Sequence, residues 1–404
     1  MAFDAQAIRA EFPILERQVN GRPLVYLDSA ASAQKPRAVI AAMVQAMEQS
    51  YANVHRGLHT LANEATDAYE ASRTKVAAFL GAQPSEIVFT KGATEAINLV
   101  AACLGSKLQP GDEILLSEME HHANIVPWHF LRERKGVVLR FAPVTDEGRL
   151  DVEGLKDLLS ERTKVLALTH MSNVLGTVNP VAELIKLAHE VGAVVLLDGC
   201  QAVVHQPIDV KALDADFYVF SGHKLYGPTG IGVLFGKAER LAELQPYQGG
   251  GEMIDAVTLE TVTYADPPQR FEAGTPPILE AIGLGAAIEW LSRLDRDAVA
   301  RHEHLLYDHV RERLNGANWL RVLGEAPGKG AIFSFVVDGA HPHDVAQILD
   351  KYGVAVRAGT HCAEPLMRRF GVTSSARASF ALYNTLDEAD AFVEALTKTQ
   401  AFFA

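Results

Sequence analysis

Short apolar runs alternate with amphipathic stretches along residues 86–235. The runs are rich in Val, Ile, Leu and Phe, which is typical of strands that are buried on both faces of a parallel sheet. Such runs occupy residues 86–89, 113–116, 137–141, 164–168, 193–197, 217–220 and 232–235. Helical patterns lie between them at residues 94–104, 124–135, 152–159 and 181–191. The alternation predicts a doubly wound, mostly parallel α/β lobe.

A stretch rich in Gly and Pro, residues 245–277, ends this alternation. The patterns beyond it predict helices at 279–294, 296–314 and 386–399 and strands at 331–337 and 354–357. This order indicates a smaller α+β lobe. We therefore expect an N-terminal segment that packs on the small lobe (1–20), a large domain (21–285) and a small C-terminal domain (286–404).

Composition narrows the possible functions. The chain has 404 residues and a formal charge of −13, and it contains no run of Lys or Arg, so neither nucleic acid nor an anionic membrane is an expected partner. The first residues lack a basic start followed by an apolar stretch, and the apolar runs are too short to span a bilayer. We expect a cytoplasmic protein.

Three widely spaced cysteines, Cys103, Cys200 and Cys362, fit neither a disulfide framework nor a zinc site. Cys103 lies in an apolar helical stretch, so we interpret it as a core residue. Cys362 follows Gly359-Thr-His361 and precedes Glu364-Pro365, which indicates an ordered loop rather than core. Cys362 is therefore the candidate for thiol chemistry, although an inert buried thiol is the alternative.

Polar residues follow three of the predicted strands at their carboxyl ends, where ligands of open α/β sheets bind. The segment Thr90-Lys-Gly-Ala-Thr94-Glu95 opens a helix, so its free N–H groups and the Thr94 hydroxyl can hold a phosphate. The alternative is an ordinary helix cap in which Glu95 favours the helix dipole. The second strand end carries Asp198. If this carboxylate is buried it needs a cationic partner; the alternative is an ordinary surface carboxylate at a strand end.

The third strand end reads Ser221-Gly-His223-Lys224. Ser221 and His223 can donate to a phosphate, and Lys224 can form a Schiff base with an aldehyde, although an isolated Lys after a strand is usually a solvated loop residue. A phosphate cradle, a carboxylate for a pyridine nitrogen and an amine for an aldehyde together predict a pyridoxal 5'-phosphate (PLP) site.

Longer motifs add a family resemblance. They read Tyr26-Leu-Asp-Ser-Ala-Ala-Ser-Ala-Gln-Lys-Pro36, His55-Arg-Gly57, Glu120-His-His-Ala-Asn124, Ser172-Asn-Val-Leu-Gly176, Ser221-Gly-His-Lys224, Arg270-Phe-Glu-Ala-Gly-Thr-Pro276, Arg357-Ala-Gly-Thr-His-Cys362 and Arg377-Ala-Ser379. Over essentially the whole chain the sequence resembles SufS-type cysteine desulfurases, which are class-V aminotransferase-like PLP enzymes. The resemblance implies PLP-dependent transferase fold type I, with a large and a small lobe.

The resemblance also implies roles for individual residues. Those that would hold PLP are Ala93 and Thr94, Ser221 and His223 at the phosphate, His121 stacked on the ring, Asp198 at the ring nitrogen, Gln201 at the ring hydroxyl and Lys224 at the aldehyde. Relatives often carry Thr at position 93, so Ala93 loses a hydroxyl contact and keeps the main-chain donor. Those that would bind substrate are Asn173 and Arg377 at its carboxylate, with His55 and Arg357 nearby.

The same resemblance implies a homodimer in which Thr275 of one subunit reaches the phosphate bound by the other. We expect no metal site. The adjacent residues His121 and His122 could form a metal site instead, but neighbouring side chains in extended backbone diverge, which disfavours binding of one metal ion by both.

The implied reaction converts L-cysteine to L-alanine and places the sulfur on Cys362 as a persulfide, for iron–sulfur cluster assembly. His121 and Lys224 would move protons, and His361, Arg357 and the cofactor could lower the pKa of the Cys362 thiol. The short cysteine loop implies a SufE- or SufU-like acceptor and Fe–S scaffold proteins as partners; Arg368-Arg369 could help to dock an acceptor, but a solvated basic pair is the plainer interpretation. Cys200, beside Asp198, replaces a common Ala and offers an oxidisable thiol.

Three alternatives remain at this point. A selenocysteine lyase would not need Cys362, an aminotransferase would produce a keto acid, and a catalytically idle sulfur carrier or scaffold would not need Lys224.

Overall fold

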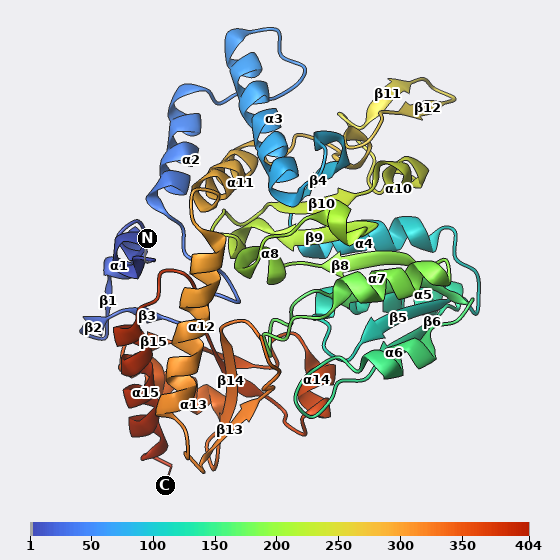
Figure 1. Cartoon of the computed structure of the whole chain (residues 1–404). Helices are drawn as coiled ribbons and strands as arrows, with labels where there is room; N and C mark the ends of the chain where they lie inside the picture. Colours follow the sequence, from blue (N-terminus) through green and yellow to red (C-terminus); the bar gives the residue numbers. More distant parts are fainter. Residues whose placement is uncertain (1–2, 404) are drawn as a thin grey trace.

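The structure is a computed structural model that describes residues 3–403. A seven-stranded sheet forms the centre of the large lobe (Figure 1). In spatial order its strands are β4 (Ile87–Thr90), β10 (Gly232–Gly236), β9 (Phe217–Ser221), β8 (Val194–Asp198), β7 (Thr163–Thr169), β5 (Glu113–Ser117) and β6 (Val138–Ala142). β10 runs antiparallel to both neighbours, and the other neighbouring pairs are parallel. All seven predicted strands are confirmed, with ends that differ by one residue.

Helices connect these strands and cover the sheet. They are α4 (Ala93–Gly105), α5 (Val126–Lys135), α6 (Val152–Leu158), α7 (Val181–Glu190), α8 (Ala202–His205), α9 (Val210–Leu213) and α10 (Ala238–Glu243). Strands β5, β9 and β10 are buried along their whole length, so both faces of the sheet are covered. The doubly wound α/β prediction is therefore confirmed, and it places the carboxyl ends of β8 and β9 side by side.

Three helices pack together at one side of the large lobe: α2 (Arg37–Gln49), α3 (Thr60–Leu80) and α11 (Ile278–Leu291). Close approach of α11 depends on glycine, because a Cβ at Gly285 would lie 2.6 Å from the Ser72 hydroxyl of α3. A hairpin of β11 (Ile254–Val257) and β12 (Val262–Tyr264) projects from the Gly- and Pro-rich stretch, on the same side of the molecule as the upper end of α3 (Figure 1).

The small lobe is an antiparallel sheet flanked by helices. Its strands, in order, are β13 (Leu320–Leu323), β14 (Ile332–Val337), β17 (Ser375–Ser379) and β16 (Arg357–Gly359). Its helices are α12 (Arg296–Arg313), α13 (Pro342–Lys351), α14 (Glu364–Arg369) and α15 (Leu386–Gln400). The predicted strand at 354–357 is divided, because β15 (Val354–Ala355) pairs with β3 (Val25–Tyr26) while β16 pairs with β17.

The N-terminal residues contact the small lobe. Besides β3, they form α1 (Ala5–Arg9), β1 (Gln18–Val19) and β2 (Arg22–Pro23). Arg9 forms an ion pair of 2.8 Å with Glu388 of α15, and Val25 and Leu27 belong to the core of the small lobe. The domain boundaries at residues 20 and 285 stay predictions, and the segments 1–20 and 286–404 each include residues (1, 2 and 404) that lie outside the described chain.

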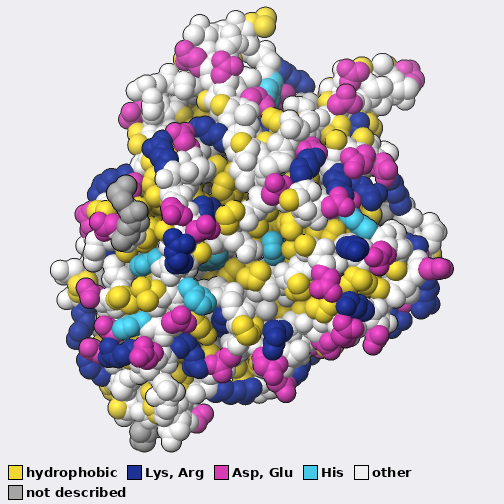
Figure 2. Space-filling view, viewed as in Figure 1, with side chains coloured by type: hydrophobic (Ala, Val, Ile, Leu, Met, Phe, Trp, Pro, Cys, Tyr) yellow, Lys and Arg dark blue, Asp and Glu magenta, His cyan; other side chains and the backbone are white. Residues whose placement is uncertain are grey.

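The described surface has two further features. In residues 3–403 no helix is long and apolar enough to cross a membrane. Figure 2 shows basic and acidic side chains interspersed over one face of the molecule, with apolar side chains in the hollows between them.

Candidate active site

A pocket of about 440 Å³ opens between the carboxyl ends of the large-sheet strands and the small lobe. The predicted residues that line it are Ala93, Thr94, His121, Asn173, Asp198, Ser221, His223, Lys224, Arg357, Cys362 and Arg377. Gln201 lies behind the wall, where its side-chain amide donates to the Ala30 carbonyl at 2.8 Å. The fold thus gathers these residues from seven separate parts of the sequence into one cavity.

One end of the pocket is the N-terminus of α4, which begins directly after β4. The first N–H groups of a helix have no partner inside it, so they can bind an anion. The Ala93 N–H donates to the Ser221 hydroxyl at 2.9 Å, which joins this turn to the end of β9. An adjoining cavity of about 460 Å³ also borders Thr94, Ser221 and His223, so this end is open on a second side.

Glycine at position 232 sets the spacing of this anion-binding turn. Gly232 of β10 lies opposite both Thr90 and Ser221, and a Cβ there would lie 2.4 Å from the Gly92 backbone. We expect Gly232→Ala to push the turn outward, at a cost of about 1–3 kcal/mol, and to weaken PLP binding by about tenfold or more. Titration of the apoprotein with PLP measures this; Gly249→Ala, where a Cβ would have nothing within 4 Å, is the control. Equal affinities would exclude this role.

Asp198 and His121 form the middle of the pocket. Asp198 is 6% exposed, accepts the Cys200 N–H at 3.0 Å and has no ion-pair partner among residues 3–403. His121 accepts the Ala123 N–H on Nδ1 at 3.1 Å. Burial and the Lys224 charge lower the pKa of His121 to about 4, against the opposing effect of Asp198. His121 is therefore neutral at pH 7, with its proton on Nε2.

Lys224 ends a short 3₁₀ turn, Gly222–Lys224, that follows β9. The carbonyl of the preceding residue, His223, accepts the Ala33 N–H at 3.1 Å and the Lys35 amine at 2.9 Å, which fixes the main chain beside Lys224. Burial lowers the pKa of Lys35 to about 8. Burial, then the charges of Lys224 and Lys35, lowers the pKa of His223 to about 4, so His223 is also neutral at pH 7.

The opposite end of the pocket presents a buried arginine. Arg377 is 1% exposed; its Nη1 donates to the Asn173 carbonyl at 2.7 Å and its Nη2 lies 3.4 Å from Asp28, but its Nε has no partner in the described part of the chain. Arg357 binds both oxygens of Asp28, with a shortest distance of 2.7 Å. Burial lowers the pKa of Arg377 to about 10, so it remains a cation at pH 7.

Cys362 lies on a tight loop between β16 and α14. Both His361 (φ 53°) and Cys362 (φ 56°) adopt left-handed backbone conformations, which non-glycine residues rarely do. The His122 N–H donates to the Cys362 carbonyl at 2.7 Å, and the Asn173 amide donates to the His361 carbonyl at 2.8 Å. The loop is thereby held, while the Cys362 side chain is exposed.

The expectation that His361 helps to lower the pKa of the Cys362 thiol stays a prediction, but the surroundings of His361 disfavour a protonated ring. His361 is buried and its Nε2 contacts the Ser375 hydroxyl at 2.9 Å. Burial first, and then the charge of Arg377, lowers its pKa to about 3. Positive charge near Cys362 therefore comes from arginine rather than from His361.

The other two thiols differ from Cys362. Cys103 is buried, its Sγ donates to the Gln245 carbonyl at 3.1 Å, and burial raises its pKa to about 11, which confirms it as a core residue. Cys200 borders the pocket, and burial raises its pKa to about 12.

Two acidic residues of the site were missed by the sequence reasoning. Asp28 lies within the Tyr26–Pro36 motif, and its position after a short apolar strand was the available signal. Glu120 precedes His121 and is fully buried; it accepts the Ser117 hydroxyl at 2.5 Å and the Asn124 amide at 2.7 Å. Burial raises the pKa of Glu120 to about 7. Its bonds fix the turn that carries His121.

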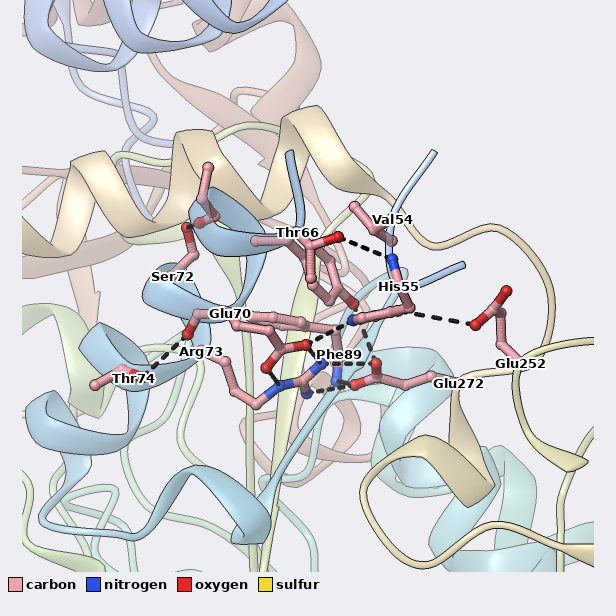
Figure 3. A network of polar contacts seen from close by, with 12 residues as sticks. Val54, His55, Thr66, Glu70, Ser72, Arg73, Thr74, Phe89, Glu252 and Glu272 are labelled. Atoms are coloured by element: carbon pink, nitrogen blue, oxygen red, sulfur yellow. Dashed lines mark hydrogen bonds and ion pairs between the residues drawn. The ribbon is translucent and has the colours of Figure 1, made fainter. Parts of the chain in front are cut away.

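Besides Gln201, two further predicted residues do not border the pocket of their own chain. Thr275 lines a separate cavity of about 330 Å³, together with Tyr69 and Glu272. His55 contacts Glu70 through Nε2 at 2.9 Å, on α3 (Figure 3).

Comparison with known proteins places this geometry in a family. The aminotransferase class-V family model matches residues 25–392. A cysteine desulfurase of Dickeya dadantii is 55% identical over 96% of this chain and 95% of its own length, and a probable cysteine desulfurase of Streptomyces coelicolor is 50% identical over 99% and 98%. The crystal structure of the cysteine desulfurase CsdA from Escherichia coli, in an S-sulfonic acid form, superposes with a TM-score of 0.93 and 42% identity over 100% of both chains.

The match covers nearly the full length, and the pocket has an anion-binding helix terminus, an unpaired buried carboxylate, a lysine and an exposed cysteine. The chain therefore belongs to the aminotransferase class-V family and, within it, to the cysteine desulfurases, whose coenzyme is PLP.

Proposed function

We propose that this cysteine desulfurase takes the sulfur of L-cysteine onto Cys362 as a persulfide and releases L-alanine. The observation that carries the proposal is the placement of Lys224, Asp198, Arg377 and Cys362 around one pocket of about 440 Å³. Two orphaned groups fit the coenzyme and the substrate. Asp198 lacks an ion-pair partner among residues 3–403, and the buried Arg377 Nε lacks an acceptor.

The residues at different ends of the pocket would bind different parts of PLP. The first turn of α4, with Thr94, Ser221 and His223, would hold the phosphate, and Asp198 would accept the proton of the pyridine nitrogen. His121 and Gln201 would contact the ring and its hydroxyl, and Lys224 would bind the aldehyde carbon. When bound, PLP withdraws electrons from the substrate Cα, which makes the Cα proton acidic.

The side chains of the chain supply the proton and sulfur chemistry. Lys224 removes the proton from the substrate Cα, and His121 Nε2–H is a second proton-bearing group at the ring. Cys362 Sγ, as a thiolate, attacks the substrate sulfur, so that an S–S bond forms while the Cβ–S bond breaks. The electron pair of the broken Cβ–S bond stays on the substrate carbon, which takes up a proton. Lys224 returns a proton to the substrate Cα, so that the product leaves as alanine.

Arg377 is the residue that we expect to orient the substrate carboxylate. Its planar fork suits two carboxylate oxygens, whereas a Lys amine offers a point charge. We expect Arg377→Lys to raise the KM for L-cysteine by about tenfold or more, and to lower kcat much less. Steady-state alanine formation measures both constants.

The matched control is Arg321→Lys in strand β13 of the same sheet, where the guanidinium donates, among residues 3–403, only to the Phe370 carbonyl at 2.7 Å. This control should leave KM unchanged. An unchanged KM in Arg377→Lys would remove Arg377 from substrate binding.

Mass spectrometry of the purified, PLP-loaded protein after mixing with L-cysteine tests the proposed function directly. The expected result is one added sulfur on the peptide that contains Cys362, removed by a reducing thiol. Keto acid as the product, in place of alanine, would indicate an aminotransferase instead.

We propose that two copies of the chain form the working enzyme. Exposed apolar side chains support this at the tip of α3 and on the hairpin, where Leu58 is 100% and Leu259 101% exposed. Val257, Val262 and Tyr264 of the hairpin add to this surface at 45–58% exposure. Large apolar side chains that are fully exposed on projecting segments suit a subunit interface, where a second copy would cover them.

We also propose a cytoplasmic role in iron–sulfur cluster assembly, with a SufE- or SufU-like sulfur acceptor and Fe–S scaffold proteins as partners. The support is the cysteine loop. Only residues 360–363 lie between β16 and α14, and the Cys362 side chain is exposed, so an acceptor thiol can reach it.

A further inference from the structure

A buried arginine network lies outside the pocket (Figure 3). Arg73 of α3 is 1% exposed and makes two parallel bonds to Glu272, from Nη1 at 2.7 Å and from Nη2 at 2.9 Å. Its Nε donates to Glu70 at 2.8 Å, and Nη1 also donates to the Ile87 carbonyl at 2.8 Å. One guanidinium therefore joins two carboxylates and a strand of the central sheet.

One arm of this network leads to His55. Glu70, held by Arg73, contacts His55 Nε2 at 2.9 Å. The His55 N–H donates to the Thr66 hydroxyl at 2.9 Å, and His55 has a φ of 68°. A histidine in this left-handed conformation needs such bonds to keep one orientation.

The other arm leads to Thr275. Glu272 also accepts the Phe89 N–H at 2.6 Å and the Tyr69 hydroxyl at 3.1 Å, so its carboxylate is fixed from several sides. Only two residues separate Glu272 from Thr275, and one of them, Gly274, has a φ of 84° and donates to the Gly251 carbonyl at 2.9 Å. The chain from Glu272 to Thr275 therefore has little freedom.

Neither His55 nor Thr275 borders the pocket of its own chain, and both segments contact the residues that lead into the exposed hairpin: Glu252 lies 3.8 Å from His55, and the Gly251 carbonyl accepts the Gly274 N–H. We infer that Arg73 is a positioning residue that acts on the active site of the other subunit, by holding His55 and Thr275 where they enter it. This inference rests on the proposed homodimer. It requires arginine, because a lysine amine cannot serve two carboxylates with parallel bonds.

Hybrid dimers distinguish an effect on the other subunit from an effect on the same chain. Two differently tagged chains are co-expressed and isolated by sequential affinity steps. In the first hybrid one chain carries Lys224→Ala and the other Arg73→Met; in the second hybrid one chain carries both substitutions and the other none. The first hybrid keeps one site that has an intact Lys224 and whose His55 and Thr275 come from a chain with an intact Arg73. The second hybrid has none.

We expect the first hybrid to have about half of the wild-type activity and the second to be at least about tenfold less active than the first, because small displacements of contacting groups cost that much. Retention of PLP after gel filtration, followed by its visible absorbance, should show the same order. The opposite order would mean that Arg73 serves its own pocket, and equal values would mean that it supports only the fold.

Three controls keep this test decisive. A hybrid of wild type and Lys224→Ala should keep half of the activity, and its failure would contradict the proposed function rather than the role of Arg73. Lys75 lies on α3, as Arg73 does, and forms an exposed ion pair with Glu289 of α11. Lys75→Met in place of Arg73→Met should leave the activity of the hybrids unchanged. If Arg73→Met does not fold, Glu70→Gln, at a half-exposed carboxylate, replaces it with the same expected order.

Discussion

Cys362→Ser stops sulfur transfer from L-cysteine while PLP stays bound. We expect alanine formation to fall by about a thousandfold or more, since removal of an enzyme nucleophile has effects of at least this size. A serine hydroxyl is not ionised at neutral pH and forms no S–S bond with the substrate. The Cys362 side chain is exposed, so its change should leave the fold intact. Alanine analysis together with the visible absorbance of bound PLP measures both parts.

The control for this variant is Cys103→Ala, which removes a buried thiol far from the pocket and should keep the activity. Selenocysteine provides a second comparison, because selenium can leave without a thiol nucleophile, so Cys362→Ser should still release it. Persistent release of both sulfur and selenium would show that Cys362 is not the nucleophile. Loss of both would indicate damage to the loop itself.

Lys224→Ala removes the amine that binds the coenzyme and moves the Cα proton. We expect a loss of activity of about a thousandfold or more. Borohydride treatment of the wild-type protein should attach PLP permanently to the peptide that contains Lys224, and the variant should not be labelled there. A catalytically idle carrier or scaffold would tolerate the change and would contain no PLP.

Two other amines make the labelling experiment specific. Burial lowers the pKa of Lys35 to about 8 and that of Lys329 to about 7, so each has a neutral fraction at pH 7 that can react with an aldehyde. Attachment of PLP at position 35 or 329 in place of 224 would contradict the assignment. Peptide mapping separates these outcomes.

The large lobe could be predicted from the sequence because its strands are fully apolar and end in polar residues. Asp198 and Ser221 could be placed at one edge of the sheet, since β8 and β9 are parallel neighbours. The strand β17 was missed, because Ser375-Ala-Arg-Ala-Ser379 has small and charged residues although all five are buried. Its Arg377 was found only through the family motif.

The charge states and long-range contacts of the site could not be predicted. His361 is next to Cys362 in sequence, but its burial against Ser375 makes it neutral. The Arg73–Glu272 pair joins positions that are 199 residues apart. Nothing in the local sequence pattern indicates such pairing, because it depends on how α3 packs on the sheet.

The pairing of β3 with β15 limits how the gene could be divided. A fragment that begins at residue 286 would lack Val25 and Leu27, which are part of the core formed with Phe333 and Phe392. Its β15 edge would also be uncovered, since β3 binds there. Such a fragment should aggregate when expressed alone, whereas a circular permutant that starts near residue 286 keeps residues 25–27 and should fold.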